Sequence, residues 1–351
     1  MNTVVTVVLP TYRRSHLLRR AINSVLRQEF TNLELLIVDD ASGDDTAETV
    51  RSFMHDSRIR YVCNPKNVGA TDNFASAIGM VRTRYFSIMG DDEILLPGFY
   101  RTTLAALEQK PDAGFSCAPV IVLGPDRKLD WRRPDYFPVG YYSPPEGFRR
   151  MLELGFPGIT GIVYRTFLRD EMGGLDPNVG HYWDFELSAR YATRYPFVVT
   201  GEPGAIFTEE AQSPYRQANK HLLPGYQHAQ NWWRKVESEY ALPRELAAET
   251  AATLRRRYGK SLYRAALDWA ADGDVEDLAR AYSILRELNH DKQGRIGRIL
   301  TLARFAPHVL KLYRLRKRLS DSPLFAARKA RKARRKFGDS LQYEKVIEQF
   351  D

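Results

Sequence analysis

Residues 85–97 read Y-F-S-I-M-G-D-D-E-I-L-L-P and carry the strongest local signal in the chain. Tyr85–Met89 is bulky and mostly apolar, as expected of a buried strand. In Gly90–Glu93 the glycine frees the backbone where three acidic residues follow in succession. Adjacent carboxylates repel, so a partly dry cleft that holds them needs a cation, and oxygen ligands suit Mg²⁺ or Mn²⁺. The alternative is a solvated acidic turn before a helix that begins near Pro97.

Three further strand-and-helix pairs precede this stretch. Apolar, partly β-branched runs predict strands at Thr3–Leu9, Leu33–Val38 and Ile59–Cys63. A helix is predicted after each, the first over Ser15–Arg27 with Ser15 as its N-cap. Strands that alternate with helices every 25 to 30 residues or so indicate βαβ units, so we expect an α/β fold with a parallel, doubly wound sheet.

Polar segments follow three of these predicted strands. They are Pro10–Tyr12, Asp39–Asp40 and Gly90–Glu93. Ligands of doubly wound sheets bind outside the carboxyl ends of the strands. We therefore expect the three segments to meet at one edge of the sheet.

The middle of the chain is predicted to complete the same sheet. Gly114–Leu123 is interpreted as one apolar strand, and Gly124–Pro145 as a long excursion over the sheet. Phe156–Arg165 is interpreted as a strand interrupted by glycines. Further strands are expected at Phe197–Thr200 and Ala205–Phe207, and helices at Gly147–Leu154 and from Trp183 to about Thr193.

From Pro214 onward the sequence has helical periodicity. Helices are predicted over Tyr215–Tyr240, Pro243–Ala271 and Asp274–Leu288, followed by an amphipathic and increasingly basic segment. The net charge of +9 comes from that end, because Lys311–Lys336 holds twelve Lys and Arg against one acid. Such a tail can lie on anionic lipid, bind nucleic acid or remain solvated. We favour peripheral attachment to an anionic membrane and expect no nucleic acid, since no recognised nucleic-acid motif accompanies the charge.

Composition indicates an ordinary globular protein. The 351 residues suffice for a large domain with an appendage. Cys63 and Cys117 lie in apolar runs and are expected to be reduced core residues. No basic leader precedes the first strand, and no apolar run approaches the roughly 20 residues that a spanning helix needs. We expect a cytoplasmic protein, with any membrane contact peripheral and on the inner face.

Four motifs in order give the N-terminal part a specific resemblance. V-V-L-P-T-Y-R-R is followed by L-E-L-L-I-V-D-D-A-S-G-D-D-T, N-V-G-A and G-D-D-E-I-L-L-P. Together they resemble the nucleotide-sugar-binding half of a family 2 glycosyltransferase of GT-A fold, of the bacterial polysaccharide or glycolipid type. A later W-D-F-E-L-S-A-R resembles the E-D-W-D-L-W-L-R helix start of that family. The resemblance covers about residues 3–208.

The resemblance, together with the helical periodicity and the charge of the C-terminal part, gives a domain division. Residues 1–210 would form the GT-A domain, with 1–110 as the nucleotide-sugar-binding half and 111–210 as the acceptor and catalytic half. Residues 211–292 would form a helical extension and 293–351 a basic amphipathic tail. The matching positions imply nucleotide-sugar contacts from Pro10, Tyr12, Asp39, Asp40, Asn67, Asn73 and Asp91, a Mn²⁺ or Mg²⁺ contact from Asp92, and a catalytic base at Asp184.

The sequence leaves structural alternatives open for several of these residues. Asp39–Asp40 could form an Asx turn, and Asp184 could be an ordinary first-turn acid of a helix. Glu186 and Arg190 complete the later motif, but they could simply pair at i, i+4. His181 is expected to be a structural histidine. Gly90 departs from the family pattern, which often has an acid there, so the metal ligand set stays open.

The predicted function is that of an inverting, metal-assisted glycosyltransferase. It would move a sugar from a nucleotide-diphospho-sugar to a hydroxyl of a glycan or lipid-linked acceptor. The favoured donor is a UDP-sugar. A nucleotidyltransferase is a second possibility, but it would be expected to have a Gly-rich phosphate loop where this chain has Pro10–Arg14. The third is a non-catalytic glycan- or nucleotide-binding protein on the same scaffold.

Overall fold

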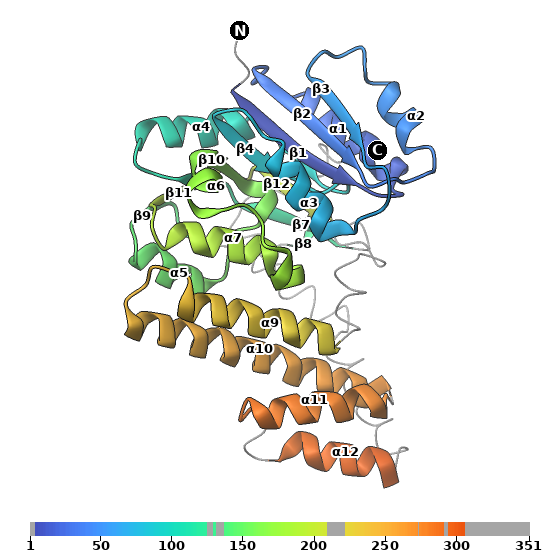
Figure 1. Ribbon diagram of the computed structural model, residues 1–351, viewed down its shortest axis with the longest axis vertical. Coiled ribbons are helices and arrows are strands. Elements are labelled where there is room, and N and C mark those ends of the chain that lie inside the picture. Colours follow the sequence, from blue (N-terminus) through green and yellow to red (C-terminus); the bar gives the residue numbers. More distant parts are fainter. Residues whose placement is uncertain are drawn as a thin grey trace. The chain divides into compact units, whose positions relative to one another are not determined.

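The computed structural model describes residues 4–124, 129–130, 137–208, 222–272, 274–290 and 294–305. The chain divides between Ser213 and Pro214 into an N-terminal unit that holds the strands and a helical unit (Figure 1). Each is described by itself below.

The N-terminal unit contains a central eight-stranded sheet. Its order is β3-β2-β1-β4-β10-β6-β11-β9. The run from β3 to β4 and the pair β6–β11 are parallel, whereas β10 and β9 pair antiparallel with their neighbours. This confirms the predicted α/β fold with a mostly parallel sheet. The strands are β1 (Val5–Thr11), β2 (Leu33–Asp39), β3 (Ile59–Cys63), β4 (Tyr85–Ile88), β6 (Phe115–Cys117), β9 (Gly140–Tyr142), β10 (Ile162–Arg165) and β11 (Phe197–Val199).

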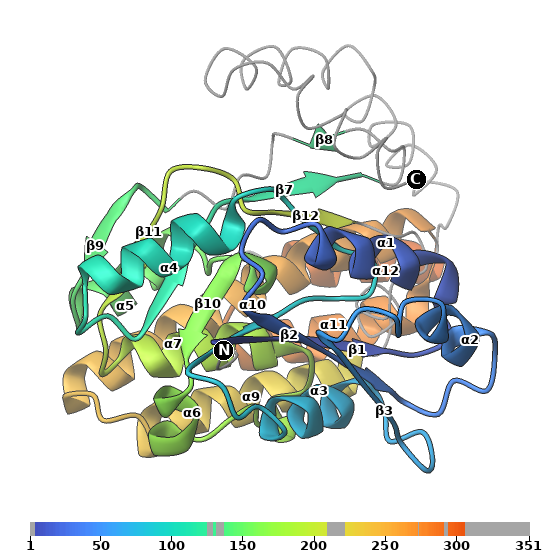
Figure 2. The same cartoon turned by 90° about the horizontal axis from the view of Figure 1, so that it is seen from above.

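Helices cover both faces of this sheet. Figure 2 shows α1 and α4 on one side and α3 and α6 on the other. The side with α1 and α4 encloses a continuous apolar cluster that includes Leu18, Ile37 and Leu104. The helices are α1 (Ser15–Leu26), α2 (Thr46–Arg51), α3 (Ala70–Gly79), α4 (Phe99–Gln109), α5 (Glu146–Leu154), α6 (Phe167–Met172) and α7 (Trp183–Ala192), with 3₁₀ turns η1 (Ile159–Gly161) and η2 (Pro177–Tyr182).

Pro10 lies inside the buried strand β1, although the sequence suggested that it would end the strand. The carbonyl of Val8 accepts from the N–H of Met89 at 3.0 Å, so Val8 faces β4. Residues two apart face the same neighbour, and the pairing with β4 ends at Ile88. The missing N–H of Pro10 therefore lies beyond the last paired residue, and the proline costs the sheet no hydrogen bond.

The prediction of one strand over Gly114–Leu123 is wrong. The segment divides into β6 and β7 (Val120–Leu123), which belong to different sheets. Pro119 stands between them, where it fixes φ and offers no N–H to a ladder. The second sheet has the order β5-β12-β7-β8, with β5 (Ile94–Leu95), β12 (Ala205–Thr208) and β8 (Leu129–Asp130).

Three smaller predictions also need correction. Only Ile162–Arg165 of the predicted Phe156–Arg165 strand is extended, because η1 turns the chain first. Ser15 is the first residue of α1 and not its N-cap, and its hydroxyl donates to Asp45 at 2.5 Å. Both cysteines are free thiols, but Cys63 is exposed because β3 is an edge strand.

Replacing Gly161 by alanine should destabilise the N-terminal unit by about 1–3 kcal/mol. A Cβ at this position would collide with the carbonyl oxygen of Ala118 and lie 2.8 Å from a methyl group of Val120. Urea unfolding measures the loss. Gly79→Ala is the matched control, since a Cβ there meets nothing within 4 Å and alanine favours the helix. Equal stabilities of the two variants would contradict the packing described at Gly161.

The helical unit consists of four described helices. They are α9 (Leu222–Ser238), α10 (Arg244–Asp272), α11 (Val275–Glu287) and α12 (Arg295–Phe305). Buried Trp232, Leu254 and Leu285 belong to its core. Asp274 caps α11 by accepting from the N–H of Asp277 at 3.0 Å. The predicted helical C-terminal extension is confirmed, but the basic segment Lys311–Lys336 lies outside the described residues. Within those residues, no helix has the length and apolarity needed to cross a membrane.

Candidate active site

The three polar segments that follow β1, β2 and β4 meet at one edge of the sheet. The Thr11 hydroxyl donates to Asp91 Oδ2 at 2.8 Å, which joins the end of β1 to the end of β4. The N–H of Asp40 donates to the carbonyl of Thr11 at 3.0 Å, and the N–H of Arg13 donates to Ser42 Oγ at 2.9 Å. These bonds join β1 to β2. The predicted convergence is confirmed.

Asp39 organises the turn that follows β2. Its carboxylate accepts from the N–H and the hydroxyl of Ser42 at 3.0 and 2.5 Å, which is the turn geometry that the sequence left as an alternative. Its second oxygen accepts from the Tyr61 hydroxyl at 2.7 Å. Burial and the neighbouring Asp39 charge raise the pKa of Tyr61. Asp39 is itself buried, so it acts on the site chiefly through this turn.

Asp40 holds a loop from the next βα connection. Its Oδ1 accepts from Asn64 Nδ2 and from the N–H of Val68, both at 2.9 Å. Its Oδ2 accepts from the N–H of Gly69, also at 2.9 Å. A carboxylate has about four acceptor positions, so three bonds leave capacity for one more donor. Asp40 is as deeply buried as Asp39, so the role that its contacts show is to fix this loop.

The other residues predicted to bind the nucleotide-sugar fall into two groups. Asn67 Nδ2 donates to the carbonyl of Asp40 at 3.3 Å, and Asn73 Nδ2 to the carbonyl of Val38 at 3.0 Å. Both amides thus support the loop around Asp40. Tyr12, in contrast, is 39 % exposed, so its ring is accessible for stacking.

Asp91 and Asp92 share one guanidinium. Arg14 Nη1 donates to Asp91 Oδ1 at 2.8 Å, and Arg14 Nη2 donates to Asp92 Oδ2 at 2.7 Å. Burial raises the pKa of Asp91 to about 6, a rise that the Arg14 charge opposes. Arg14 stands three residues beyond Thr11, so the end of β1 supplies both a hydroxyl and a cation to the acids after β4.

Glu93 does not join this pair, which corrects the expectation of three gathered acids. Its Oε2 accepts from the N–H of Gly90 at 2.6 Å and from the Thr160 hydroxyl. The residue is 3 % exposed. Burial, with the charge of Asp92, raises the pKa of Glu93 to about 8, so the carboxyl is mainly protonated at neutral pH. Glu93 thus ties the acidic loop to η1.

Asp184 lies in the first turn of α7. Its Oδ1 accepts from the N–H of Phe185 at 2.8 Å, and the residue is partly exposed. The adjacent Trp183 ring packs against Phe74 of α3 in a tilted arrangement, with centroids 4.8 Å apart. Since α3 begins immediately after Gly69, which Asp40 binds, a continuous series of contacts connects the start of α7 with the end of β2.

Sequence comparison adds to this geometry. Residues 6–172 match the family model described as Glycosyl transferase family 2. Residues 6–172, most of the N-terminal unit, form a family 2 glycosyltransferase domain.

Curated relatives match part of this transferase domain. The chain is 33% identical over 113 residues to GalNAc(5)-diNAcBac-PP-undecaprenol beta-1,3-glucosyltransferase of Campylobacter jejuni, which covers 32% of this chain and 35% of the relative. It is 34% identical over 91 residues to UDP-Glc:alpha-D-GlcNAc-diphosphoundecaprenol beta-1,3-glucosyltransferase WfgD of Escherichia coli, which covers 26% and 36%. The matches thus span about a third of the length of these relatives.

A solved structure resembles the chain over most of its length. The S. aureus TarS 1-349 structure in complex with UDP-GlcNAc aligns with a TM-score of 0.60 at 14% identity, over 91% of this chain and 93% of that chain. At this identity the likeness supports the shared fold alone.

The acidic pair of the transferase domain offers oxygen ligands for a metal ion. No three His, Cys, Asp or Glu side chains converge as metal ligands among the described residues. Asp91 and Asp92 nevertheless hold one cationic group between them at 2.7 and 2.8 Å, and both present oxygen ligands. The pair therefore fits a Mg²⁺ or Mn²⁺ ion that takes its remaining ligands from phosphate oxygens and water.

Glu186 and Arg190 serve the structure of α7. Arg190 Nε donates to Glu186 Oε1 at 2.8 Å, and Glu186 is fully buried. The guanidinium also donates to the carbonyls of Met172, Gly173 and Gly174. The i, i+4 pair proposed from the sequence is confirmed, and it fixes α7 to the preceding turn.

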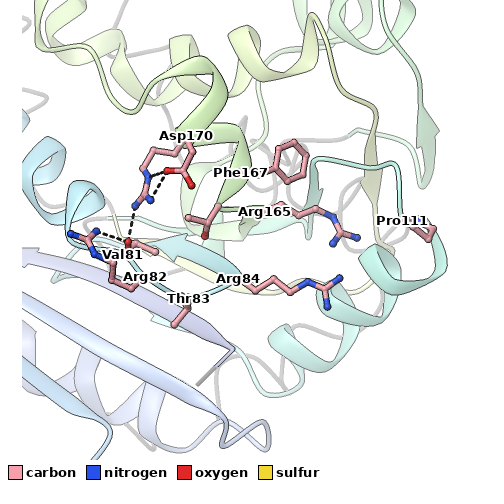
Figure 3. Close-up of a pocket in the computed structure, with 10 residues that line it drawn as sticks. Val81, Arg82, Thr83, Arg84, Pro111, Arg165, Phe167 and Asp170 are labelled. Atoms are coloured by element: carbon pink, nitrogen blue, oxygen red, sulfur yellow. Dashed lines mark hydrogen bonds and ion pairs between the residues drawn. The ribbon is translucent and has the colours of Figure 1, made fainter. Parts of the chain in front are cut away.

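A separate cavity of about 550 Å³ lies at the other end of β4, where that strand begins (Figure 3). Its lining comes from Val81–Arg84, Pro111 and the segment Arg165–Asp170. Because these segments stand at the start of β4 and the end of antiparallel β10, the cavity is far along the strand from the acids. None of the predicted site residues is among its described lining residues.

Three of the four arginines that line this cavity donate to main-chain carbonyls near helix ends. Arg82 and Arg169 donate to carbonyls at the end of α3 and just beyond it at 2.7 to 2.9 Å, and Arg165 donates to a carbonyl of α4 at 2.7 Å. Helix C-termini carry partial negative charge, so guanidinium groups stabilise them. We assign these three side chains to the capping of helix ends and not to the binding of a nucleotide-sugar.

Sequence reasoning missed three residues of the site, namely Arg14, Asn64 and Thr160. Arg14 could have been found, because the predicted topology places the end of β1 beside the acids after β4 and two arginines follow that end. Thr160 and Asn64 carry no such signal, since their contacts with Glu93 and Asp40 depend on tertiary pairing.

Proposed function

We propose that this chain transfers a sugar from a nucleotide-diphospho-sugar, first a UDP-sugar, to a hydroxyl of a glycan or lipid-linked acceptor. The observation that carries the proposal is the gathering of Tyr12, Asp40, Asp91 and Asp92 at one sheet edge of a family 2 domain. The two relatives support the donor and acceptor class, since one name includes UDP-Glc and both name undecaprenol-linked diphosphates.

The donor nucleotide would bind between β1 and β2. The exposed Tyr12 ring offers a stacking surface for a base. Asp40 would accept a hydrogen bond from the base at its remaining acceptor position, once its loop admits the ligand, and Asp39 would act through the turn that it organises. Asn67 and Asn73 would act by holding the loop that Asp40 organises.

The diphosphate would lie beside Asp91 and Asp92. A divalent cation bound there neutralises charge that develops on the leaving diphosphate. Asp92 is the proposed direct ligand, and Asp91, held by Thr11 and Arg14, would support it. Glu93 would take no direct part, because its carboxyl is turned into the protein.

Asp184 would remove the proton of the acceptor hydroxyl as that oxygen attacks the sugar carbon. The N–H of Phe185 orients its carboxylate, and partial exposure keeps the group accessible to an acceptor. Attack from the side opposite the leaving diphosphate inverts the anomeric configuration. Inversion is therefore part of the proposal.

A non-catalytic binding protein is the second candidate. Two observations favour it: Gly90 replaces the first acid of the metal motif, and an arginine already bridges the remaining acids. Such a protein would bind nucleotide or glycan without turnover.

Release of nucleoside diphosphate distinguishes the two candidates. UDP-, GDP- and dTDP-sugars are incubated with the protein and an undecaprenol-linked sugar diphosphate, with Mn²⁺ or with chelator. We expect UDP release and a glycosylated lipid from at least one UDP-sugar, with an inverted anomeric carbon by NMR. Nucleotide binding without release from any donor would favour the second candidate.

A further inference from the structure

Arg14 satisfies both acids of the proposed metal site at once. One guanidinium nitrogen binds Asp91 at 2.8 Å and another binds Asp92 at 2.7 Å. The Asp91 and Asp92 side chains are only 6% and 13% exposed, and that of Arg14 is 23% exposed. Arg14 thus bridges two carboxylates with one charge-assisted hydrogen bond to each.

The remaining acceptor atoms of the pair are also constrained. The second oxygen of Asp91 takes the Thr11 hydroxyl at 2.8 Å. The second oxygen of Asp92 lies over Gly90, where a Cβ would come within 2.9 Å of it. A side chain at residue 90 would therefore press on the Asp92 carboxylate, and the glycine leaves the room in which Asp92 reaches Arg14.

A cation entering this site has to compete with the guanidinium. One arginine offsets part of the charge of the two buried carboxylates, and taking it away leaves buried negative charge without that cation. The other nearby guanidinium, that of Arg20, binds the main-chain carbonyl of Asp92 at 2.8 Å and the Thr208 hydroxyl, not the carboxylates. Among the described residues, the cationic side chain that pairs with both carboxylates is thus Arg14.

We propose that Arg14 is an internal counter-ion that a divalent cation must displace, so that metal binding depends on donor binding. This inference rests on the proposed function. A displaced guanidinium needs a new anionic partner, and the diphosphate of a donor supplies one beside the same acids. Metal and donor then bind cooperatively, whereas metal alone binds weakly.

The test titrates the full chain with Mn²⁺ alone, with free Mn²⁺ measured by electron paramagnetic resonance. We expect Arg14→Ala and Arg14→Gln to bind Mn²⁺ about tenfold tighter than wild type or more, because the competing charge is gone. Arg13→Ala is the matched control, since it removes the same charge one residue away and Arg13 contacts Ser42 instead of the acids. Equal Mn²⁺ affinities of wild type and both Arg14 variants would overturn the proposal.

A second arm adds UDP. Wild type should bind Mn²⁺ about tenfold tighter or more with UDP than without it, and this gain should shrink in the Arg14 variants. Thermal unfolding shows whether each Arg14 variant is folded. If neither variant folds, the wild-type comparison decides: wild type that binds UDP but binds Mn²⁺ no tighter with UDP than without it overturns the inference. If no nucleoside diphosphate binds at all, the proposed function fails. The titration with Mn²⁺ alone still tests whether Arg14 competes with the metal ion.

Discussion

Asp184→Asn is expected to lower the rate of sugar transfer by about 10²–10⁴-fold, the usual contribution of a general base. Asparagine keeps the size of the side chain and can still accept from the N–H of Phe185, so the first turn of α7 should keep its conformation. It cannot take the acceptor proton at neutral pH. Nucleotide affinity should not change, because the residues proposed to contact the nucleotide and diphosphate lie at the carboxyl ends of β1, β2 and β4 and not on α7.

The measurement is the transfer rate at saturating donor, together with nucleotide binding by calorimetry. Asp170→Asn is the matched control, since Asp170 is an exposed acid that pairs with Arg169 on α6. It should keep its transfer rate. Unchanged turnover in Asp184→Asn would remove Asp184 from the chemistry, and lost nucleotide binding would show that it shapes the donor site instead.

Arg190→Met is expected to destabilise the N-terminal unit by about 3–5 kcal/mol, as when one partner of a buried ion pair is removed. Glu186 would remain fully buried without its cation. The carbonyl of Gly174 would also lose the Arg190 donor, whereas that of Gly173 would keep the Tyr191 hydroxyl. Because α7 carries Asp184, the loss should reach the proposed base.

Urea unfolding of the N-terminal unit measures this cost. Arg150→Met is the control, because the pairs of Arg150 with Glu146 and Glu153 on α5 are about half exposed and contribute roughly 0–1 kcal/mol. The double variant Glu186→Gln, Arg190→Met should recover part of the loss, since no buried charge remains. A loss in Arg190→Met no larger than in Arg150→Met would contradict a buried, charged pair.

The first four βα units could be predicted because their signals are local. Each strand is an apolar run that ends in polar residues, and each ending lies at the carboxyl edge, where Asp39, Asp40 and Asp91 were expected. Parallel topology then brings these endings together without knowledge of any side-chain contact.

The second sheet could not be predicted from local patterns. β5 has two residues, and its partner β12 lies about 110 residues later in the chain. Pro119 was the available signal that Gly114–Leu123 would divide, but its effect depends on which neighbours each half meets.

The three acids also differ in their contacts because those contacts depend on tertiary structure. Asp91, Asp92 and Glu93 are equivalent in the sequence, yet Glu93 turns inward because Thr160 and the N–H of Gly90 receive it. The Asp39 and Asp40 contacts show the same limit. The sequence identified both carboxylates, but not that each first stabilises the surrounding loops.

Calorimetric binding of UDP, GDP, CDP and dTDP tests the central claim, a nucleotide-sugar site at the carboxyl edge of β1, β2 and β4. Each nucleotide is titrated into the purified protein with Mn²⁺ and again with chelator. We expect one of them, first UDP, to bind in Mn²⁺ and to bind much more weakly in chelator. If none binds under either condition, the donor site does not exist and the transferase proposal is contradicted.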